Sequence, residues 1–341
     1  MKRHGHLYEQ ITDLDNLWSA HKAARKGKTQ QRAVKRIDNN PDKHLHLLHD
    51  LLESGEYRTG RYSVREMAER GKARTIYRLP YWPDRVVQHA IAQVMIPIWQ
   101  PTLIRHTYAS IKGRGIHDAA HTVRAQLRTD RPGTKYCLKM DVRKFYPTIP
   151  HDLLVGLLSR KIKDARALDL LEEIVRSVSI ASPDVGVPIG NYLSQWFANL
   201  YLSPADWRIK QHYRVRYYHR YCDDLVLLHH DKSFLHRVRW DLSEWLSREF
   251  RLDVKGDWQV FPVQARGVDF VGYRMWPDKT LLRKPTKKRM AARLSPERAA
   301  RRSPAGVQAT RRSAGSYDGW TRFGSTRNLR TKIITPWMGP A

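Results

Sequence analysis

Tyr221-Cys222-Asp223-Asp224 lies between residues 213–220, which are rich in aromatic and basic side chains, and the apolar residues 225–228. Strand-forming residues on both sides of a short polar break predict two strands joined by a tight turn. Aspartate tolerates turn geometry, so a lone Asp-Asp pair is also explained as a hairpin tip. The rest of the chain favours a second explanation.

A second carboxylate ends a similar segment upstream. Residues 136–142 form a short strand-like run that contains Asp141 and continues into residues 143–147, Arg-Lys-Phe-Tyr-Pro. If the strands bearing Asp141 and Asp223 were neighbours, their carboxylates would converge at one end of a sheet. Converging carboxylates repel unless a cation neutralises them, and Mg²⁺ takes oxygen ligands. Two such ions about 4 Å apart can activate an attacking oxygen and stabilise a leaving one in phosphoryl transfer.

A glycine-bounded loop lies between the two acidic segments. Gly186 and Gly190 enclose an apolar sequence, and residues 193–202 carry large apolar side chains at spacings of three and four. This spacing predicts a packed helix after the loop. The pattern alone does not separate a functional loop from an ordinary turn.

Together the three segments resemble, in order and spacing, the catalytic motifs of reverse transcriptases. Asp141 with Phe145-Tyr146 resembles the first motif, residues 188–195 resemble the template and nucleotide-handling motif, and residues 221–224 resemble the Tyr-x-Asp-Asp motif. The resemblance extends over about residues 61–336. It implies an α+β fold of the right-hand polymerase type, with fingers, a ferredoxin-like palm of antiparallel sheet plus helices, and a helical thumb.

The resemblance and the apolar periodicity predict four regions. Residues 1–60 form an N-terminal helical extension, residues 61–135 the fingers, residues 136–277 the palm and residues 278–341 a basic helical thumb. Within the palm, residues 151–185 form a helical insertion that returns to the fingers.

The implied activity is that of an RNA-directed DNA polymerase, a nucleotidyltransferase in which a primer 3′-hydroxyl attacks the α-phosphate of a deoxynucleotide. Asp141, Asp223 and Asp224 are the catalytic candidates and would bind two Mg²⁺ ions, with Mn²⁺ as a substitute. The Val142 carbonyl would complete one metal shell. Asp224 would point away from Asp223 if both lay in one strand, so its role is less secure. Lys255 is a candidate general acid for pyrophosphate, with a surface lysine as the alternative.

Eight positions are candidates for nucleotide binding. Arg74 suits a triphosphate because its planar donors match phosphate oxygens, and either Lys72 or Arg65 would be a second phosphate contact. Tyr146 would stack under the sugar and exclude a 2′-hydroxyl by collision, with a core tyrosine as the alternative. Gly190 allows the backbone to approach the nucleotide closely. The full set is Lys72, Arg74, Phe145, Tyr146, Ile189, Gly190, Ser194 and Gln195.

Two loop positions point to a subgroup. Most reverse transcriptases carry glutamine before the loop glycine and proline after its serine, where this chain has Ile189 and Gln195. The Ile-Gly-x-x-x-Ser-Gln form is similar to that of diversity-generating retroelement reverse transcriptases, which misincorporate opposite template adenines. An alkyl group only packs beside a nucleotide, whereas an amide would hydrogen-bond and favour one geometry. Ile189 is interpreted as a fidelity determinant, with a hydrophobic loop anchor as the alternative.

This subgroup implies partners and a setting. A reverse transcriptase binds template RNA, primer, cDNA product and deoxynucleotides, and mutagenic retrohoming would add a dedicated template RNA and a basic oligomeric accessory protein. The chain would be bacterial or phage-encoded and cytoplasmic. Two other functions stay open: a more faithful group II intron-like or phage-defence reverse transcriptase, and a non-enzymatic RNA-binding scaffold with a decayed palm. The presence of all three acids argues against decay.

The charge of the chain favours a nucleic-acid partner. Its 341 residues include 62 Lys and Arg against 33 Asp and Glu, and a net charge of +29 creates a field that gathers polyanions. Residues 283–341 contain fifteen Lys or Arg and two acids, as expected for a thumb that contacts phosphates without reading sequence. Trp320, Phe323 and Trp337 favour packed structure there over a solvated tail.

Other residue patterns limit the remaining functions. Cys137 and Cys222 make neither a disulfide framework nor a zinc pattern, and reduced thiols fit the cytosol. No His-Cys spacing supports a metal site. Residues 1–6 lack the apolar core of a signal peptide, and the apolar run at residues 90–99 is too short and interrupted to span a bilayer. No membrane partner is therefore expected.

Overall fold

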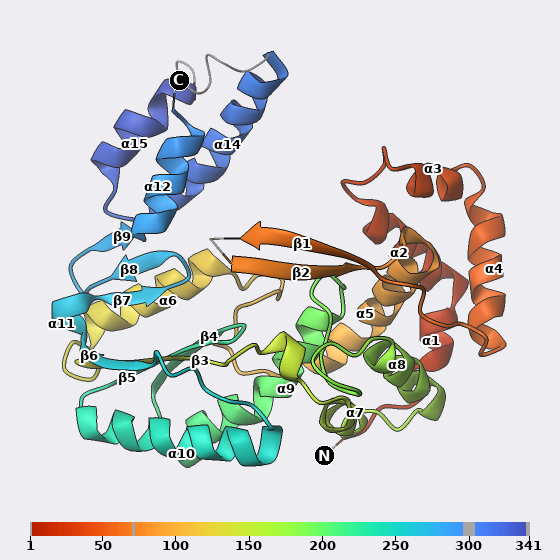
Figure 1. The fold of residues 1–341 in the computed structure, drawn as a ribbon, viewed down its shortest axis with the longest axis horizontal. Coiled ribbons are helices and arrows are strands. Elements are labelled where there is room, and N and C mark those ends of the chain that lie inside the picture. The colour runs from red at the N-terminus through yellow and green to blue at the C-terminus, as the bar shows by residue number, and fades with distance from the viewer. Residues whose placement is uncertain (1, 70–71, 296–303, 339–341) are drawn as a thin grey trace. The chain divides into compact units, whose positions relative to one another are not determined.

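The computed structural model describes residues 2–69, 72–295 and 304–338 (Figure 1). Helices and antiparallel sheets both occur along it, so the predicted α+β class is confirmed. The predicted residue bounds of the fingers, palm and thumb stay a prediction. Spatial contacts divide the chain differently, into unit 1 (Met1–Arg105, Val142–Arg208 and Leu242–Val254) and unit 2 (His106–Asp141, Ile209–Asp241 and Lys255–Ala341).

Unit 1 begins with a group of helices that share a buried apolar core. Asp13 accepts a hydrogen bond from Asn16 N at the start of the second helix, and Asn40 accepts one from Lys43 N at the start of the fourth. Such caps satisfy the free N–H groups of a first turn. The helices are α1 (Tyr8–Thr12), α2 (Leu14–Arg25), α3 (Arg32–Asp38) and α4 (Pro41–Glu53).

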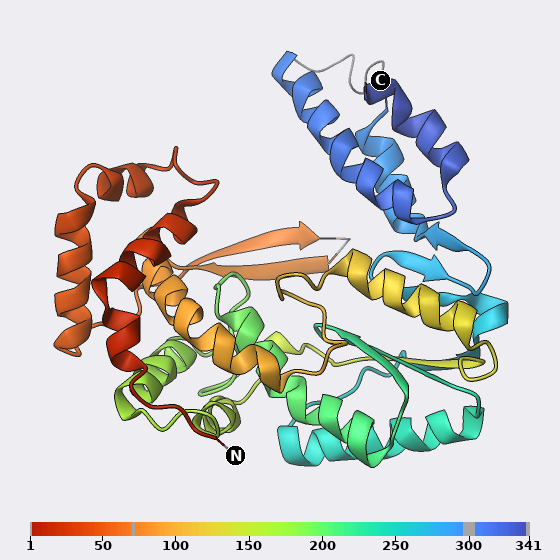
Figure 2. The same cartoon turned by 180° about the vertical axis from the view of Figure 1, so that it is seen from behind.

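A hairpin and a long apolar helix follow. Strands β1 (Ser63–Glu69) and β2 (Lys72–Arg78) pair antiparallel, and α5 (Val86–Trp99) packs against α1 and α2, as Figures 1 and 2 show. Asp84, just before α5, accepts hydrogen bonds from the Tyr57 hydroxyl at 3.0 Å and from the backbone of Gly60 at 2.9 Å. These bonds hold the segment that leads into the hairpin.

The remainder of unit 1 is mainly helical. In the predicted insertion, α7 packs against α8, and α7 also packs against the long helix that follows the glycine loop. Helix α10 contributes its last turns to unit 1 and its first turns to unit 2. The elements are η1 (Tyr81–Arg85), η2 (Gln100–Thr102), η3 (Tyr146–Thr148), α7 (His151–Ser159), α8 (Ala165–Arg176), α9 (Ser194–Trp207) and α10 (Lys232–Phe250).

Unit 2 contains a four-stranded antiparallel sheet in the order β4-β5-β3-β6. Consecutive residues of β3 and β5 are buried, so both faces of the central strands are covered and no strict alternation of polar and apolar residues is needed. Helix α6 (Ile116–Thr129) packs against β4. The strands are β3 (Tyr136–Asp141), β4 (Tyr217–Tyr221), β5 (Asp224–His229) and β6 (Gln259–Pro262), and η4 (Arg208–His212) precedes β4.

A second sheet, β7-β8-β9, carries the C-terminal helices of unit 2. The Trp320 ring stacks on Tyr273 of this sheet with centroids 5.3 Å apart. Trp320, Phe323 and Trp337 pack against the buried core of unit 2, so the prediction of packed structure in this basic region is confirmed. The elements are α11 (Val263–Arg266), β7 (Val268–Phe270), β8 (Tyr273–Met275), β9 (Thr280–Leu282), α12 (Lys284–Arg293), α14 (Pro304–Phe323), α15 (Arg327–Ile333) and η5 (Thr335–Trp337).

Parts of two predictions fall on residues that the structure does not describe. The predicted basic helical thumb at residues 278–341 includes residues 296–303 and 339–341, which lie outside the described ranges. The side chain of Lys72 also lies outside them. Within the described ranges, no helix is both long enough and apolar enough to cross a bilayer.

Candidate active site

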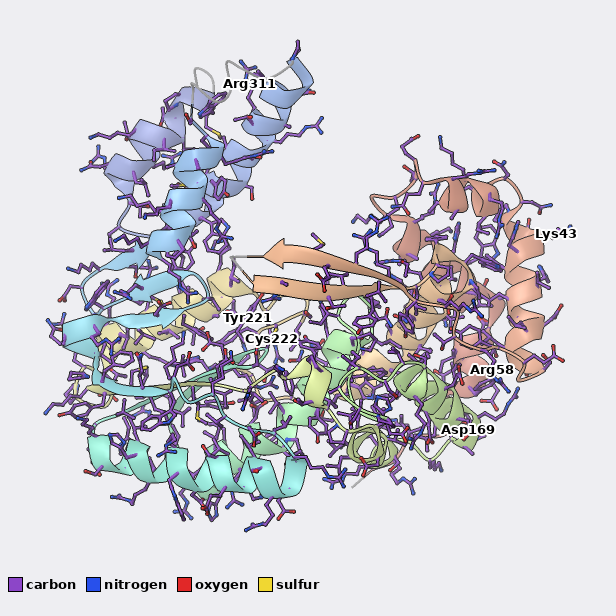
Figure 3. All side chains as sticks on the ribbon, viewed as in Figure 1. Lys43, Arg58, Asp169, Tyr221, Cys222 and Arg311 are labelled. Carbon is purple, nitrogen blue, oxygen red and sulfur yellow. The ribbon has the colours of Figure 1, made fainter. Side chains whose placement is uncertain are left out.

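The Tyr-x-Asp-Asp sequence forms the turn between β4 and β5, where Figure 3 labels Tyr221 and Cys222. Tyr221 pairs with Asp224 across the hairpin, so Cys222 and Asp223 are its two turn residues. Cys222 has φ +53°, a left-handed conformation that two-residue hairpin turns commonly use. The predicted hairpin is confirmed.

The two acidic segments meet in the sheet although they are far apart in sequence. Strand β3 pairs with β5 in a register that places Asp141 opposite Asp224. Directly opposed residues project to the same face of a sheet, so the two carboxylates share one face and one end of it. Asp224 is therefore the direct cross-strand partner of Asp141. Because Asp223 lies in the turn before β5, the two acids do not share a strand, which was the condition for Asp224 to point away from Asp223. Asp223 follows from the adjoining turn.

A lysine ammonium group binds each of the two opposed carboxylates. Lys255 Nζ forms an ion pair with Asp141 Oδ1, and Lys139 Nζ lies 3.2 Å from Asp224 Oδ2. The ammonium of Lys139 also donates a 2.6 Å hydrogen bond to the carbonyl of Asp269 in β7. Lys139 was missed in the sequence. Its position two residues before Asp141 could have identified it, because side chains two residues apart lie on the same face of a strand.

The charge of Asp223 acts on the lysine that binds Asp141. Burial raises the pKa of the Asp224 carboxyl to about 6; the charge of Lys139 opposes this rise and that of Asp141 adds to it. Burial alone would lower the pKa of the Lys255 ammonium, but its hydrogen bond to Asp141 and the charges of Asp141, Asp223 and Asp257 raise it overall. The charges of Asp141 and Asp223 both raise the pKa of Lys255, so the two acids affect the same ammonium group.

One carboxylate oxygen of the site is suited to a cation. Oδ1 of Asp224 is buried and has no hydrogen-bond partner in the described part of the chain. A buried carboxylate oxygen without a partner is costly, and a hard cation satisfies it. In this conformation, no three His, Cys, Asp or Glu side chains of the described residues are grouped to hold a metal ion, and lysines contact both Asp141 and Asp224. An ion on Asp141 Oδ1 would have to displace Lys255.

Val142 follows Asp141 in the chain and belongs to unit 1. It forms an isolated antiparallel bridge with Val254, and Arg143 N donates a 2.7 Å hydrogen bond to the Asp253 carbonyl. These contacts fix the backbone just beyond the first catalytic motif. The role of the Val142 carbonyl as a metal ligand stays a prediction.

Several predicted nucleotide-binding residues meet in unit 1. The carbonyl of Tyr146 accepts a 2.8 Å hydrogen bond from Val187 N, and the carbonyl of Ile189 accepts one of 2.8 Å from Tyr77 N. The glycine loop is therefore bound on one side to the first catalytic motif and on the other to β2, the strand that carries Arg74.

The hairpin register puts Arg65 and Arg74 on one face. Arg65 pairs with Ile76, which lies two residues after Arg74 in β2 and so projects to the same side. Both arginines are exposed. The choice between Arg65 and Lys72 as the second phosphate contact remains open.

Gly190 has a packing requirement that the sequence did not reveal. Its φ is +122°, and a Cβ at this position would collide with the carbonyl oxygen of Tyr77 in β2. The neighbouring Ile189 is half-buried. The loop therefore needs glycine for its contact with the hairpin, and close approach to a nucleotide stays a prediction.

The other predicted positions differ in exposure. Phe145 is 2% exposed and contacts the Tyr146 ring edge-on with centroids 5.6 Å apart, so it supports that ring from the core. Ser194 is buried at the start of α9, while Gln195 is exposed. Of these three, Gln195 offers the most accessible side chain for a ligand.

Comparisons with known proteins agree with this geometry. Residues 64–275 match the family model described as reverse transcriptase (RNA-dependent DNA polymerase). YkfC of Escherichia coli (strain K12) is 27% identical over 271 residues, which cover 68% of this chain and 71% of YkfC. The group II intron-encoded protein LtrA of Lactococcus lactis subsp. cremoris is 24% identical over 133 residues, covering 38% of this chain but only 22% of LtrA.

A solved structure supports the fold. The solved structure is telomerase from Candida albicans in complex with the TWJ fragment of telomeric RNA. The match covers 83% of this chain and 56% of the telomerase chain, with a TM-score of 0.50 and 12% sequence identity. At that identity the likeness concerns the fold alone, and the predicted right-hand polymerase architecture is confirmed. Since the family model covers more than half of its residues, the chain belongs to the reverse transcriptase (RNA-dependent DNA polymerase) family, as its sequence predicted.

Proposed function

We propose that this chain copies a template RNA into cDNA by two-metal nucleotidyl transfer. The observation that carries the proposal is the register of β3 and β5, which opposes Asp141 and Asp224 and leaves Asp223 in the adjoining turn. Asp141, Asp223 and Asp224 would hold Mg²⁺, or Mn²⁺ in its place, with the Val142 carbonyl as a further ligand. Such ions activate the attacking primer hydroxyl and stabilise the leaving oxygen.

The remaining residues would bind and orient the deoxynucleotide. The exposed guanidinium of Arg74 would bind the triphosphate, and Tyr146, held by Phe145 and the glycine loop, would stack under the sugar. Lys255 would donate a proton to the pyrophosphate. Its raised pKa keeps the ammonium protonated in this conformation but opposes release of the proton, because a general acid works best with a pKa near the operating pH.

The base of the C-terminal helices offers a surface for the primer and cDNA strands. A cavity of about 1100 Å³ in unit 2 is lined by basic side chains from β8, the residue before α12, α12 itself and the start of α15. Its one acidic lining residue is paired with two of these arginines, Arg274 and Arg283. Lys and Arg bind phosphates independently of sequence. The basic lining residues are Arg274, Arg283, Lys284, Lys287 and Arg327, and the acid is Asp269.

Primer extension tests the polymerase. The wild-type chain should incorporate deoxynucleotides on a primed RNA only with a divalent cation, and Asp223→Ala should abolish incorporation. Asp278→Asn, which alters an exposed carboxylate paired with Arg131, is the matched control and should behave as wild type. Wild-type incorporation by Asp223→Ala would refute the metal assignment. A wild-type chain that binds RNA tightly but incorporates nothing would instead support a non-enzymatic RNA-binding scaffold.

We further propose that copying is error-prone at template adenines, as in a diversity-generating retroelement, with a dedicated template RNA and a basic oligomeric accessory protein as partners. The support is the Ile-Gly-x-x-x-Ser-Gln sequence of the loop, where Ile189 has no side-chain hydrogen-bonding group to hold a nucleotide in one geometry. Ile189→Gln should reduce misincorporation opposite adenine. An unchanged error spectrum would remove Ile189 as a fidelity determinant.

A more faithful reverse transcriptase, of the group II intron or phage-defence kind, is the second candidate. The similarity to LtrA, a group II intron-encoded protein, favours it. Sequencing the cDNA made from a defined RNA separates the two, because the errors of a faithful enzyme should not concentrate at adenines.

A further inference from the structure

The turn between β4 and β5 holds Cys222 in a conformation that its residue type disfavours (Figure 3). Its φ is +53°, in the left-handed region that glycine enters freely and most other residues enter at a cost. Two-residue hairpin turns usually place Gly, Asn or Asp at such a position. A residue in this region keeps its conformation only where its surroundings fix it. The turn that carries Asp223 therefore needs a support.

Arg220, two residues before Cys222 in β4, supplies that support. Its Nη1 donates a 3.0 Å hydrogen bond to the Cys222 carbonyl. Because a peptide bond is planar, a fixed carbonyl also fixes the N–H group of Asp223, which belongs to the same peptide. A charged donor makes a stronger hydrogen bond than a neutral one. The guanidinium therefore restrains the link between the two turn residues.

Arg220 is itself held firmly. Its side chain is 0% exposed, and charged side chains are rarely buried so completely. Its backbone N–H donates to the His106 carbonyl at 3.0 Å, and its carbonyl accepts from Tyr108 N at 3.1 Å. On the other side Arg220 pairs with Leu225 in β5. With its backbone bound on both sides and its side chain in the core, the guanidinium has little freedom to move.

The preceding residue binds the same support to the rest of unit 2. His219 is fully buried, and its two ring nitrogens are hydrogen-bonded to the Tyr108 hydroxyl at 3.1 Å and to Gln126 Oε1 at 2.7 Å. Gln126 belongs to α6, which packs against β4. These bonds join α6 and residues 106–108 to the strand that carries Arg220.

The sheet register puts Arg220 on the face opposite to Asp141 and Asp224. Those two acids oppose each other, and Asp224 also pairs with Tyr221, whereas Arg220 pairs with Leu225. Successive residues of a strand project to opposite faces. A positive charge beside the turn would by itself weaken the binding of a cation, because like charges repel. The hydrogen bond to the turn, and not the charge, therefore explains an arginine at this position.

We propose that Arg220 is a positioning residue for nucleotidyl transfer, which holds the turn in the conformation that lets Asp223 bind a divalent cation. The assignment rests on the proposed function, in which Asp223 is a metal ligand. Without the hydrogen bond the turn would relax to conformations that cost Cys222 less, and a bound cation would have to restore the disfavoured one. Positioning and charge thus predict opposite effects of removing the guanidinium.

Equilibrium binding of Mn²⁺ to the full chain, without nucleic acid, tests this role. Electron paramagnetic resonance of free Mn²⁺ measures the binding, and Asp223→Ala identifies the part that depends on the turn. Arg220→Met keeps a long unbranched side chain but has no donor. It should weaken this binding by roughly 5- to 30-fold, the factor that corresponds to the cost of one left-handed residue other than glycine.

Cys222→Gly separates positioning from a general loss of stability. Glycine enters the left-handed region without that cost, so the double variant Arg220→Met/Cys222→Gly should bind Mn²⁺ within about threefold of Cys222→Gly alone. Arg220→Lys keeps the charge and a donor but lacks the planar guanidinium, and it should lose less affinity than Arg220→Met. If Arg220→Met does not fold, Arg220→Lys with and without Cys222→Gly makes the same comparison.

Tyr217→Phe is the matched control. It removes a 2.6 Å hydrogen bond to Asp130 Oδ2 from the opposite end of β4. This variant should bind Mn²⁺ as wild type does, even where its stability falls.

Three outcomes would overturn the role: unchanged or tighter Mn²⁺ binding by a folded Arg220→Met chain, a loss that Cys222→Gly does not restore, or an equal loss in Tyr217→Phe. Wild-type Mn²⁺ binding that is insensitive to Asp223→Ala would reject the metal assignment and this role with it. A wild-type chain that binds Mn²⁺ through Asp223 but incorporates nothing on primed RNA rejects the polymerase proposal alone, and the Mn²⁺ comparison still decides whether Arg220 positions the turn.

Discussion

Replacing Lys139 with methionine would test how the paired acids are held. The change keeps side-chain length but removes the 3.2 Å ion pair with Asp224 and the 2.6 Å hydrogen bond to the Asp269 carbonyl. The Lys139 and Asp224 side chains are 26% and 23% exposed, so solvent screens them only partly. Leaving a buried polar partner unpaired costs about 1–3 kcal/mol, and we expect the free energy of unfolding to fall by about 2 kcal/mol at pH 8.

The fall in the free energy of unfolding caused by Lys139→Met should be larger at high pH than at low pH. Asp224 has a folded pKa of about 6, raised above its ordinary value, so the folded state takes up a proton as the pH falls through that value, and stability from this group is lost as the pH rises. Without Lys139 the pKa rises further. The mutational loss should therefore be smaller at pH 5, where Asp224 is protonated, than at pH 8.

Urea unfolding followed by tryptophan fluorescence at pH 5 and pH 8 measures this difference. Lys135→Met is the matched control, because Lys135 is exposed just before β3 and its Nζ lies over the Tyr136 ring. Its effect should stay within about 0.5 kcal/mol. Equal losses for Lys139→Met at the two pH values would refute the coupling of Lys139 to Asp224.

Two further predictions concern the glycine loop and the metal. Gly190→Ala should lower the free energy of unfolding by about 1–3 kcal/mol, because φ is +122° and the new Cβ meets the Tyr77 carbonyl, whereas Gly156→Ala in α7, where a Cβ meets no atom within 4 Å, should be neutral or stabilising. Equal unfolding midpoints would contradict this. Chelation should abolish incorporation, and Mn²⁺ affinity should fall about tenfold per pH unit below pH 6, because Asp224 with its pKa of about 6 must lose its proton to bind. Affinity independent of pH would remove Asp224 from the metal site.

The sequence alone predicted the reverse transcriptase family and the local elements that carry its motifs. The turn at Cys222-Asp223 follows from a polar break between two strand-forming runs, and the helix after Gly190 follows from apolar spacing. Such features depend on residues close together in the chain, so a reader of the sequence can find them.

Only the tertiary structure decided which side chains meet. The register that opposes Asp141 to Asp224, the ammonium of Lys139 on Asp224 and the stacking of His89 on Tyr192 each join residues that are 83 to 103 positions apart. Register in a sheet with both faces buried is set by the packing of the whole core, and a central strand without alternating polarity carries no local mark of its partner. The acids and Lys255 were therefore visible in the sequence, while the contact of Lys139 with Asp224 and the stacking of His89 on Tyr192 were not.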